Sequence, residues 1–139
     1  MREILFRGKR VANGKWVKGF AFEQHSPTEK EQWYIRSYET DYNVDPKTVG
    51  QFTGLYDKNG KKIFEGDIVH AVYQSNYGGL ENTDFGIGVV KYSDSYYGGA
   101  AYEIDIIGES GSRAFSTALE KGVTIIGNVW DNPELLKEE

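Results

Sequence analysis

The side chains with the strongest potential for chemistry stand together near the middle of the chain. Glu65 and Asp67 are two carboxylates separated by Gly66, and His70 follows in the same segment. Carboxylates beside an imidazole are the groups used in general acid–base catalysis and in metal binding. Turn geometry explains the same residues, because a carboxylate after glycine is typical of a turn in which Asp67 bonds the backbone and Glu65 faces water. An enzyme with a carboxylate and histidine site is therefore an alternative hypothesis.

No complete constellation for metal, cofactor or nucleophilic chemistry is visible elsewhere. His25 and His70 are 45 positions apart, which is not a metal-ligand spacing. The chain has no cysteine, so thiolate ligands and a cysteine nucleophile are excluded. No phosphate-binding glycine loop or nucleophile elbow is complete. The sequence therefore assigns no catalytic residue, no metal ligand and no cofactor.

Two segments rich in Tyr, Ser and Gly offer a binding surface instead. Residues 74–79 and 94–99 both carry Ser, Tyr and Gly-Gly, and they flank the expected strand 87–92. Tyr supplies a large contact area at low entropic cost, and exposed rings stack on bases. The competing interpretation is two β-turns whose rings fold back on the sheet. The main hypothesis is a non-enzymatic macromolecule-binding module that contacts its partner through three residues: Tyr77, Tyr96 and Tyr97.

Charge is placed unevenly along the chain. Residues 1–18 hold six of the 16 basic side chains and one of the 21 acidic ones, which leaves 10 basic and 20 acidic groups elsewhere. Such asymmetry indicates either a nucleic-acid or partner surface, or two ordinary solvated faces. A second alternative is therefore a nucleic-acid-binding protein that contacts phosphates through its basic N-terminal hairpin. The residues of this hypothesis are Arg7, Lys9, Arg10 and Lys15.

The elements that would position these residues are short strands. The chain has 139 residues, 14% of them aromatic, with 17 Gly and only 3 Pro, which favours one β-rich domain over residues 1–139. We expect about eight or nine short strands and one or two short helices, arranged as a small barrel or roll. Residues 23–32 and 38–46 are expected to be loops, and residues 112–121 are ambiguous between loop and short helix. The expected strands cover residues 4–6, 15–22, 33–36, 48–53, 68–73, 86–92, 101–107 and 123–130.

The most informative local pattern is a tight hairpin at Leu55–Ile63. Asp57 suits its first turn position, where the carboxylate accepts backbone N–H groups, and Asn59-Gly60 tolerates the conformations that close it. Asn13-Gly14 predicts a second hairpin with a two-residue loop. Asn132-Pro133 predicts a capped helical turn near the C-terminus.

Hydrophobicity predicts a soluble protein. The first residues contain too short an apolar run for a signal peptide, and no stretch approaches the roughly 20 apolar residues that span a bilayer. We therefore expect a cytoplasmic protein that has no membrane partner.

Three segments carry a resemblance to a known family. The chain resembles the YopX family of bacteriophage and prophage proteins in the segments Met1–Arg7, Gln51–Val69 and Ile126–Leu136. The resemblance runs from end to end and implies a single YopX-like domain with a mainly β, SH3-like barrel fold. It also implies a phage or prophage setting in a bacterial host, with homo-oligomers as an option. The resemblance carries over no catalytic residue. The expected partner is an unidentified protein or nucleic acid.

Overall fold

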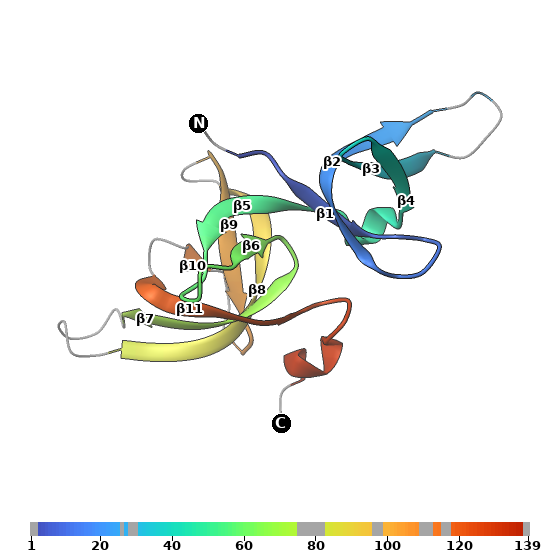
Figure 1. Ribbon diagram of the computed structural model, residues 1–139. Helices are drawn as coiled ribbons and strands as arrows, with labels where there is room; N and C mark the ends of the chain where they lie inside the picture. Colours follow the sequence, from blue (N-terminus) through green and yellow to red (C-terminus); the bar gives the residue numbers. More distant parts are fainter. Residues whose placement is uncertain are drawn as a thin grey trace. The chain divides into compact units, whose positions relative to one another are not determined.

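The computed structural model describes residues 3–25, 27, 31–74, 83–95, 99–108, 113–114 and 118–137. These residues form antiparallel strands and two short 3-10 helices (Figure 1). Among them, no helix has the length and apolar character needed to cross a membrane. The elements are β1 (Phe6–Lys9), β2 (Trp16–Gln24), β3 (Gln32–Ser37), β4 (Thr40–Val44), η1 (Pro46–Thr48), β5 (Gly50–Tyr56), β6 (Lys62–Phe64), β7 (Asp67–Gln74), β8 (Thr83–Ser95), β9 (Gly99–Ile106), β10 (Arg113–Ala114), β11 (Ala118–Asn128) and η3 (Pro133–Leu136).

The chain divides into two compact units. Unit 1 comprises Met1–Gly54 and unit 2 comprises Leu55–Glu139. The strands are ordered β4-β3-β2-β1-β5-β6 in one sheet and β10-β9-β8-β7-β11 in the other, and β5 runs across the boundary between the units. The mainly β prediction is confirmed. Neither sheet closes on itself within the described residues, so the predicted SH3-like barrel is not confirmed.

Unit 1 is organised by the close pairing of its first strands. Gly8 on β1 pairs with Val17 on β2, and a Cβ at Gly8 would lie 3.0 Å from Ile35 Cδ1 and 3.2 Å from Val44 Cβ. Ile35 and Val44 are almost fully buried. The absence of a side chain at Gly8 therefore lets the branched side chains of β3 and β4 pack against β1.

One predicted loop is a strand. The prediction that residues 38–46 form a loop is wrong, because Thr40–Val44 form β4 and pair with β3 from Ser37 to Trp33. Asp41 and Asn43 occupy one face of β4, whereas Val44 on the other face is buried. Because β4 is short and one of its faces is exposed, its sequence is mostly polar and resembles that of a loop. Tyr38, in the turn before β4, has a φ of 56°.

Unit 2 contains a compact apolar core, formed by one face of the sheet β10-β9-β8-β7-β11 together with Ile63 of β6. Its buried members are Ile63, Val69, Ala71, Val90, Ile104, Ile106 and Val123. Side chains alternate between the two faces of a strand, so Ile104 and Ile106 are buried in this core while Glu103 and Asp105 point to the opposite face. Full burial of each Ile or Val side chain in this core contributes about 1.5–3 kcal/mol. This core confirms the predicted strands over residues 68–73, 86–92 and 101–107, and β8 is longer than predicted.

The predicted hairpin at Leu55–Ile63 is confirmed. The Asp57 N–H donates to the Lys61 carbonyl at 2.8 Å, and Gly60 has a φ of 80°. Its tip also covers an open sheet edge, because β11 is the last strand of its sheet. Lys58 N–H donates to the Val123 carbonyl at 2.9 Å, and Ile125 N–H donates to Asp57 Oδ2 at 3.1 Å. The hairpin tip thus satisfies backbone groups that an edge strand otherwise presents to solvent or to another chain.

Three local predictions change in detail. The hairpin at Asn13-Gly14 forms, but its loop is longer than two residues, since Arg10 N–H donates to the Lys15 carbonyl. In the ambiguous region 112–121, residues 113–114 and 118–121 are strand rather than helix. Pro133 does begin a helical turn, yet Asn132 does not cap it. Its Oδ1 instead accepts the N–H of Asn128 at 3.2 Å.

Candidate functional site

The turn that contains Glu65 and Asp67 is a structural element of unit 2. Asp67 is buried, and its Oδ2 accepts the Phe64 N–H at 2.8 Å. Gly66 has a φ of 87°, and a Cβ there would lie 2.3 Å from Trp130 Cη2. The Gly66 N–H donates to Val90, and the Gly66 carbonyl accepts from Val129. This turn therefore fits beneath the Trp130 indole, and its carboxylate stabilises the backbone.

The geometry around His70 does not favour a shared catalytic site. His70 lies three residues after Asp67 on β7, so the two side chains point to opposite faces of the strand. The pairing of Ile68, Val69 and His70 with β8 is regular, which leaves that alternation intact. The carboxylates and the imidazole of the enzyme alternative are therefore not brought together by this strand.

Three of the four cations proposed for the basic hairpin lie against aromatic rings. The Arg7 guanidinium carbon is 4.8 Å and Lys9 Nζ is 5.5 Å from the Trp16 ring centroid, and the Arg10 guanidinium carbon is 4.6 Å from that of Tyr42. Arg7 is buried, so its charge is not presented to a phosphate at the surface. Lys9 and Arg10 are half-buried, and Lys15 is exposed. Of the four predicted nucleic-acid contacts, the last three remain accessible.

Two of these cations also line an open pocket. The pocket has a volume of about 410 Å³ and is lined by Lys9, Arg10, Val11, Gly14, Asp45 and Pro46. Asp45 accepts the Lys47 N–H at the start of η1, and its own N–H donates to the Lys9 carbonyl. The pocket thus joins the hairpin loop to η1 and contains both signs of charge.

The predicted tyrosine contacts, Tyr77, Tyr96 and Tyr97, lie outside the described residues and stay predictions. The described strands do show where their segments attach. Residues 75–82 connect the end of β7 to Thr83 at the start of β8, and residues 96–98 connect Ser95 at its other end to β9. A strand of 13 residues spans at most about 40 Å. The described residues that adjoin the two segments in the sequence, Thr83 and Ser95, are the two ends of this strand.

The exposed face of the β2–β3 hairpin carries a row of aromatic rings that we call the aromatic face. It comprises Lys18, Phe20, Phe22, Tyr34 and Arg36. The ring centroids of Phe20 and Phe22 are 6.5 Å apart and those of Phe22 and Tyr34 are 5.6 Å apart, with interplanar angles of 21° and 18°. Phe20 remains 60% exposed. Large rings exposed in a contiguous group are typical of interaction surfaces.

A charged pair borders this face. The Arg36 guanidinium carbon lies 5.2 Å from the Phe22 ring centroid. Arg36 Nε and Nη2 donate to the two carboxylate oxygens of Asp41 at 2.6 and 3.0 Å. This bidentate hydrogen bonding lowers the pKa of Asp41 and raises that of Arg36. Asp41 therefore fixes the position of Arg36 over the ring and neutralises its charge.

The sequence did not reveal the aromatic face because both faces of β2 read as apolar. Phe20 and Phe22 alternate with Gly19 and Ala21, and bulky rings ordinarily point inward. In the structure a Cβ at Gly19 would lie 2.0 Å from the carbonyl oxygen of Arg36. The small residues thus face the crowded interior, and the rings are left outside.

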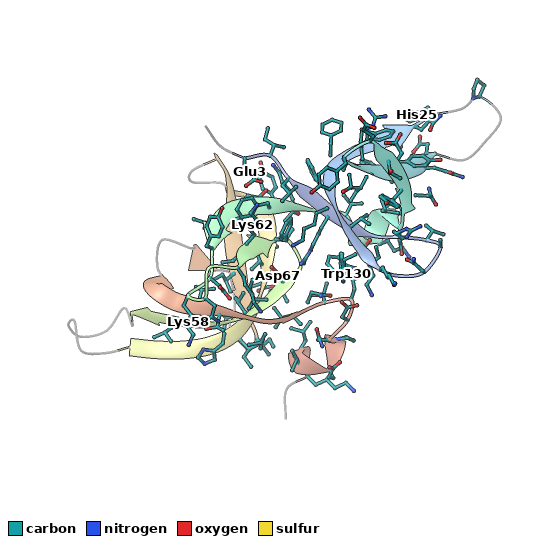
Figure 2. The ribbon with its side chains drawn as sticks, viewed as in Figure 1. Glu3, His25, Lys58, Lys62, Asp67 and Trp130 are labelled. Atoms are coloured by element: carbon teal, nitrogen blue, oxygen red, sulfur yellow. The ribbon has the colours of Figure 1, made fainter. Side chains whose placement is uncertain are left out.

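A further group of titratable side chains lies at the end of the β2–β3 hairpin, where Figure 2 places His25. His25 Nε2 is 3.6 Å from Glu23 Oε2, and His25 Nδ1 is 3.4 Å from Glu31 Oε1. A hydrogen bond to the Glu31 carboxyl raises the pKa of Glu23, with smaller contributions from burial and from the Glu31 charge. An imidazole and two carboxylates are donors suited to a metal ion, and all three lie within 4.8 Å of one another. Their mutual contacts also suit an ion-paired hairpin tip. Sequence spacing missed the group because the hairpin brings Glu31 back to Glu23.

Comparison with known proteins agrees with this architecture. A family model described as YopX protein matches residues 5–137. None of the curated proteins compared with the chain matches it. Among solved structures, protein EF1440 from Enterococcus faecalis is similar at 21% identity and a TM-score of 0.54, and the alignment covers 99% of this chain and 100% of that one. That similarity shows a shared fold. The family match spans nearly the whole sequence and both units, so the chain belongs to the YopX family.

Proposed function

We propose that this protein is a non-enzymatic binding module that holds a macromolecular partner on the aromatic face of unit 1. The observation that carries the proposal is the exposed Phe20 ring, stacked in a row with Phe22 and Tyr34. Exposing such rings to water is unfavourable unless a partner covers them. Within the segment Gln51–Val69, Asp57, Gly66 and Asp67 are engaged in hydrogen bonds with the backbone, which leaves recognition to other surfaces.

The family assignment supports a wider proposal about setting. We infer that the protein is an accessory protein of a phage or prophage, acts in the cytoplasm of a bacterial host, and functions as one YopX-like domain formed by both units. A homo-oligomer is compatible with this role. The segments with Tyr77 and with Tyr96–Tyr97 remain candidate secondary contacts.

Affinity capture from host cells tests the binding role. We expect wild-type protein to retain a partner that is lost from Phe20→Ala and Tyr34→Ala. The matched control is Tyr92→Ala, because Tyr92 is 50% exposed and lies in unit 2. Phe20→Ala removes an exposed ring and should lower the free energy of unfolding by less than about 1 kcal/mol, so loss of capture would not reflect misfolding. Retention of every partner by the face variants, or equal loss from the control, would reject the aromatic face as the binding surface.

A further inference from the structure

We propose that the aromatic face binds single-stranded nucleic acid, with bases stacked on its rings and phosphates held by neighbouring cations. This inference rests on the proposed binding function and specifies its partner. The register places the relevant residues on one side of the sheet. Phe20 pairs with Arg36 and Phe22 pairs with Tyr34, while Lys18 lies two residues before Phe20 on the same side of β2.

Rings and cations lie together on this face. Phe20, Phe22 and Tyr34 form a row of nearly parallel rings, and Lys18 and Arg36 lie beside them. Unpaired bases stack on such rings irrespective of sequence, while Lys and Arg follow the phosphates. Bases in a duplex already stack on each other, so a row of side-chain rings selects single strands.

Charge also distinguishes the two units. Unit 1 contains 9 basic and 7 acidic side chains, a balance of +2, and unit 2 contains 7 basic and 14 acidic, a balance of −7. The net charge of −5 for the whole chain therefore conceals a basic unit. The exposed face that would meet a polyanion belongs to that unit, and this charge complementarity favours a polyanion such as nucleic acid over a basic partner.

Asp41 makes the inference testable by a gain of affinity. It is the one acidic side chain on this side of the described strands β1–β4, and it neutralises Arg36 through two hydrogen bonds. Glu23 pairs with Trp33, and it therefore lies on the opposite side of the sheet. Replacing Asp41 by Asn keeps a hydrogen-bonding partner for Arg36 and releases one positive charge beside the rings.

The test is fluorescence anisotropy with labelled oligonucleotides of twelve thymidines, twelve uridines and a duplex of the same length. We expect the full chain to bind both single strands more tightly than the duplex at 50 mM salt. The affinities for the thymidine and uridine oligonucleotides show whether DNA or RNA is bound more tightly. Phe20→Ala should weaken binding by at least about fivefold, because each base–aromatic stack contributes substantially to affinity. Tyr92→Ala in unit 2 should leave it unchanged.

Asp41→Asn should tighten binding about threefold or more and make the dependence of log affinity on log salt steeper by about 0.7. The matched control is Asp105→Asn, because Asp105 is also an exposed acid paired with a cation, Lys91, but lies in unit 2. If both variants gained affinity equally, the gain would come from the net charge of the protein. That result would overturn the proposed surface.

Two further results would overturn the nucleic-acid assignment. One is the absence of binding to either single strand at 50 mM salt, and the other is tighter binding of the duplex. If Phe20→Ala nevertheless lost a protein captured from host cells, the proposed binding function would stand with a different partner. If capture too were unaffected, both proposals would fail.

Discussion

The Asp57 carboxylate accepts a hydrogen bond from the Ile125 N–H at 3.1 Å, which joins two residues 68 positions apart in the sequence. Its other oxygen accepts the N–H groups of Asn59 and Lys61, each at 2.9 Å. One buried side chain therefore closes the hairpin and attaches it to the edge of β11. This dual role explains why the most distinctive segment of the family resemblance needs no catalytic interpretation.

Asp57→Ala should destabilise the protein strongly. The substitution leaves three backbone N–H groups without their acceptor in a buried site, and we expect the free energy of unfolding to fall by about 2–4 kcal/mol. Urea unfolding followed by circular dichroism measures the change. Asp105→Ala is the control, since Asp105 is half-exposed and its pair with Lys91 should contribute less than about 0.5 kcal/mol. Equal midpoints for the two variants would contradict the role of Asp57.

The same carboxylate should make stability depend on acid pH. Burial acts to raise the pKa of Asp57, but the N–H groups of Lys61, Ile125 and Asn59 together lower it below the ordinary value of 3.8. A folded-state pKa below the unfolded-state value contributes stability above about pH 4, and this contribution is lost as pH falls through the folded-state pKa. Thermal unfolding between pH 5 and 2.5 should show a smaller decline for Asp57→Asn than for the wild type. Parallel curves would exclude Asp57 as a source of acid sensitivity.

Gly66→Ala should be much more damaging than Gly60→Ala. Both glycines have positive φ, near 87° and 80°. A Cβ at Gly60 meets nothing within 4 Å, whereas a Cβ at Gly66 would enter the Trp130 ring. We expect a loss of about 1–2 kcal/mol at Gly60 from backbone strain alone, and about 3 kcal/mol or more at Gly66. Denaturant midpoints of the two variants provide the comparison, and similar values would mean that Trp130 moves aside freely.

Glu31→Gln should return the pKa of Glu23 towards its ordinary value of 4.5. The wild-type pKa is raised chiefly by the hydrogen bond between the two carboxyl groups, and a neutral amide at position 31 donates to a carboxylate without repelling it. A carbon-13 NMR titration of the Glu side chains measures the shift. Gln24→Glu adds an acid on the opposite side of β2 and serves as the control. An unchanged pKa in Glu31→Gln would show that the two carboxyl groups do not meet in solution.

The sequence by itself determined features that depend on neighbouring residues. Asp57, Asn59 and Gly60 specify a turn through local backbone preferences, and alternation in Ala101–Ile107 specifies a strand with one buried face. The mainly β class and the YopX resemblance followed from such local patterns. The strand at Thr40–Val44 escaped prediction because its short, polar segment becomes regular only by pairing with β3.

Only the tertiary structure decided which surfaces are available for recognition. Phe20 and Ala21 both suit a buried strand, and the tight approach of Gly19 to the β3 backbone is what turns the rings outward. In the same way, Asp57 suits a turn in the sequence, but its contact with Ile125 exists because β11 lies at a sheet edge. Local preferences fix backbone conformation over a few residues, whereas the buried face and the long-range partner depend on packing between segments far apart in the chain.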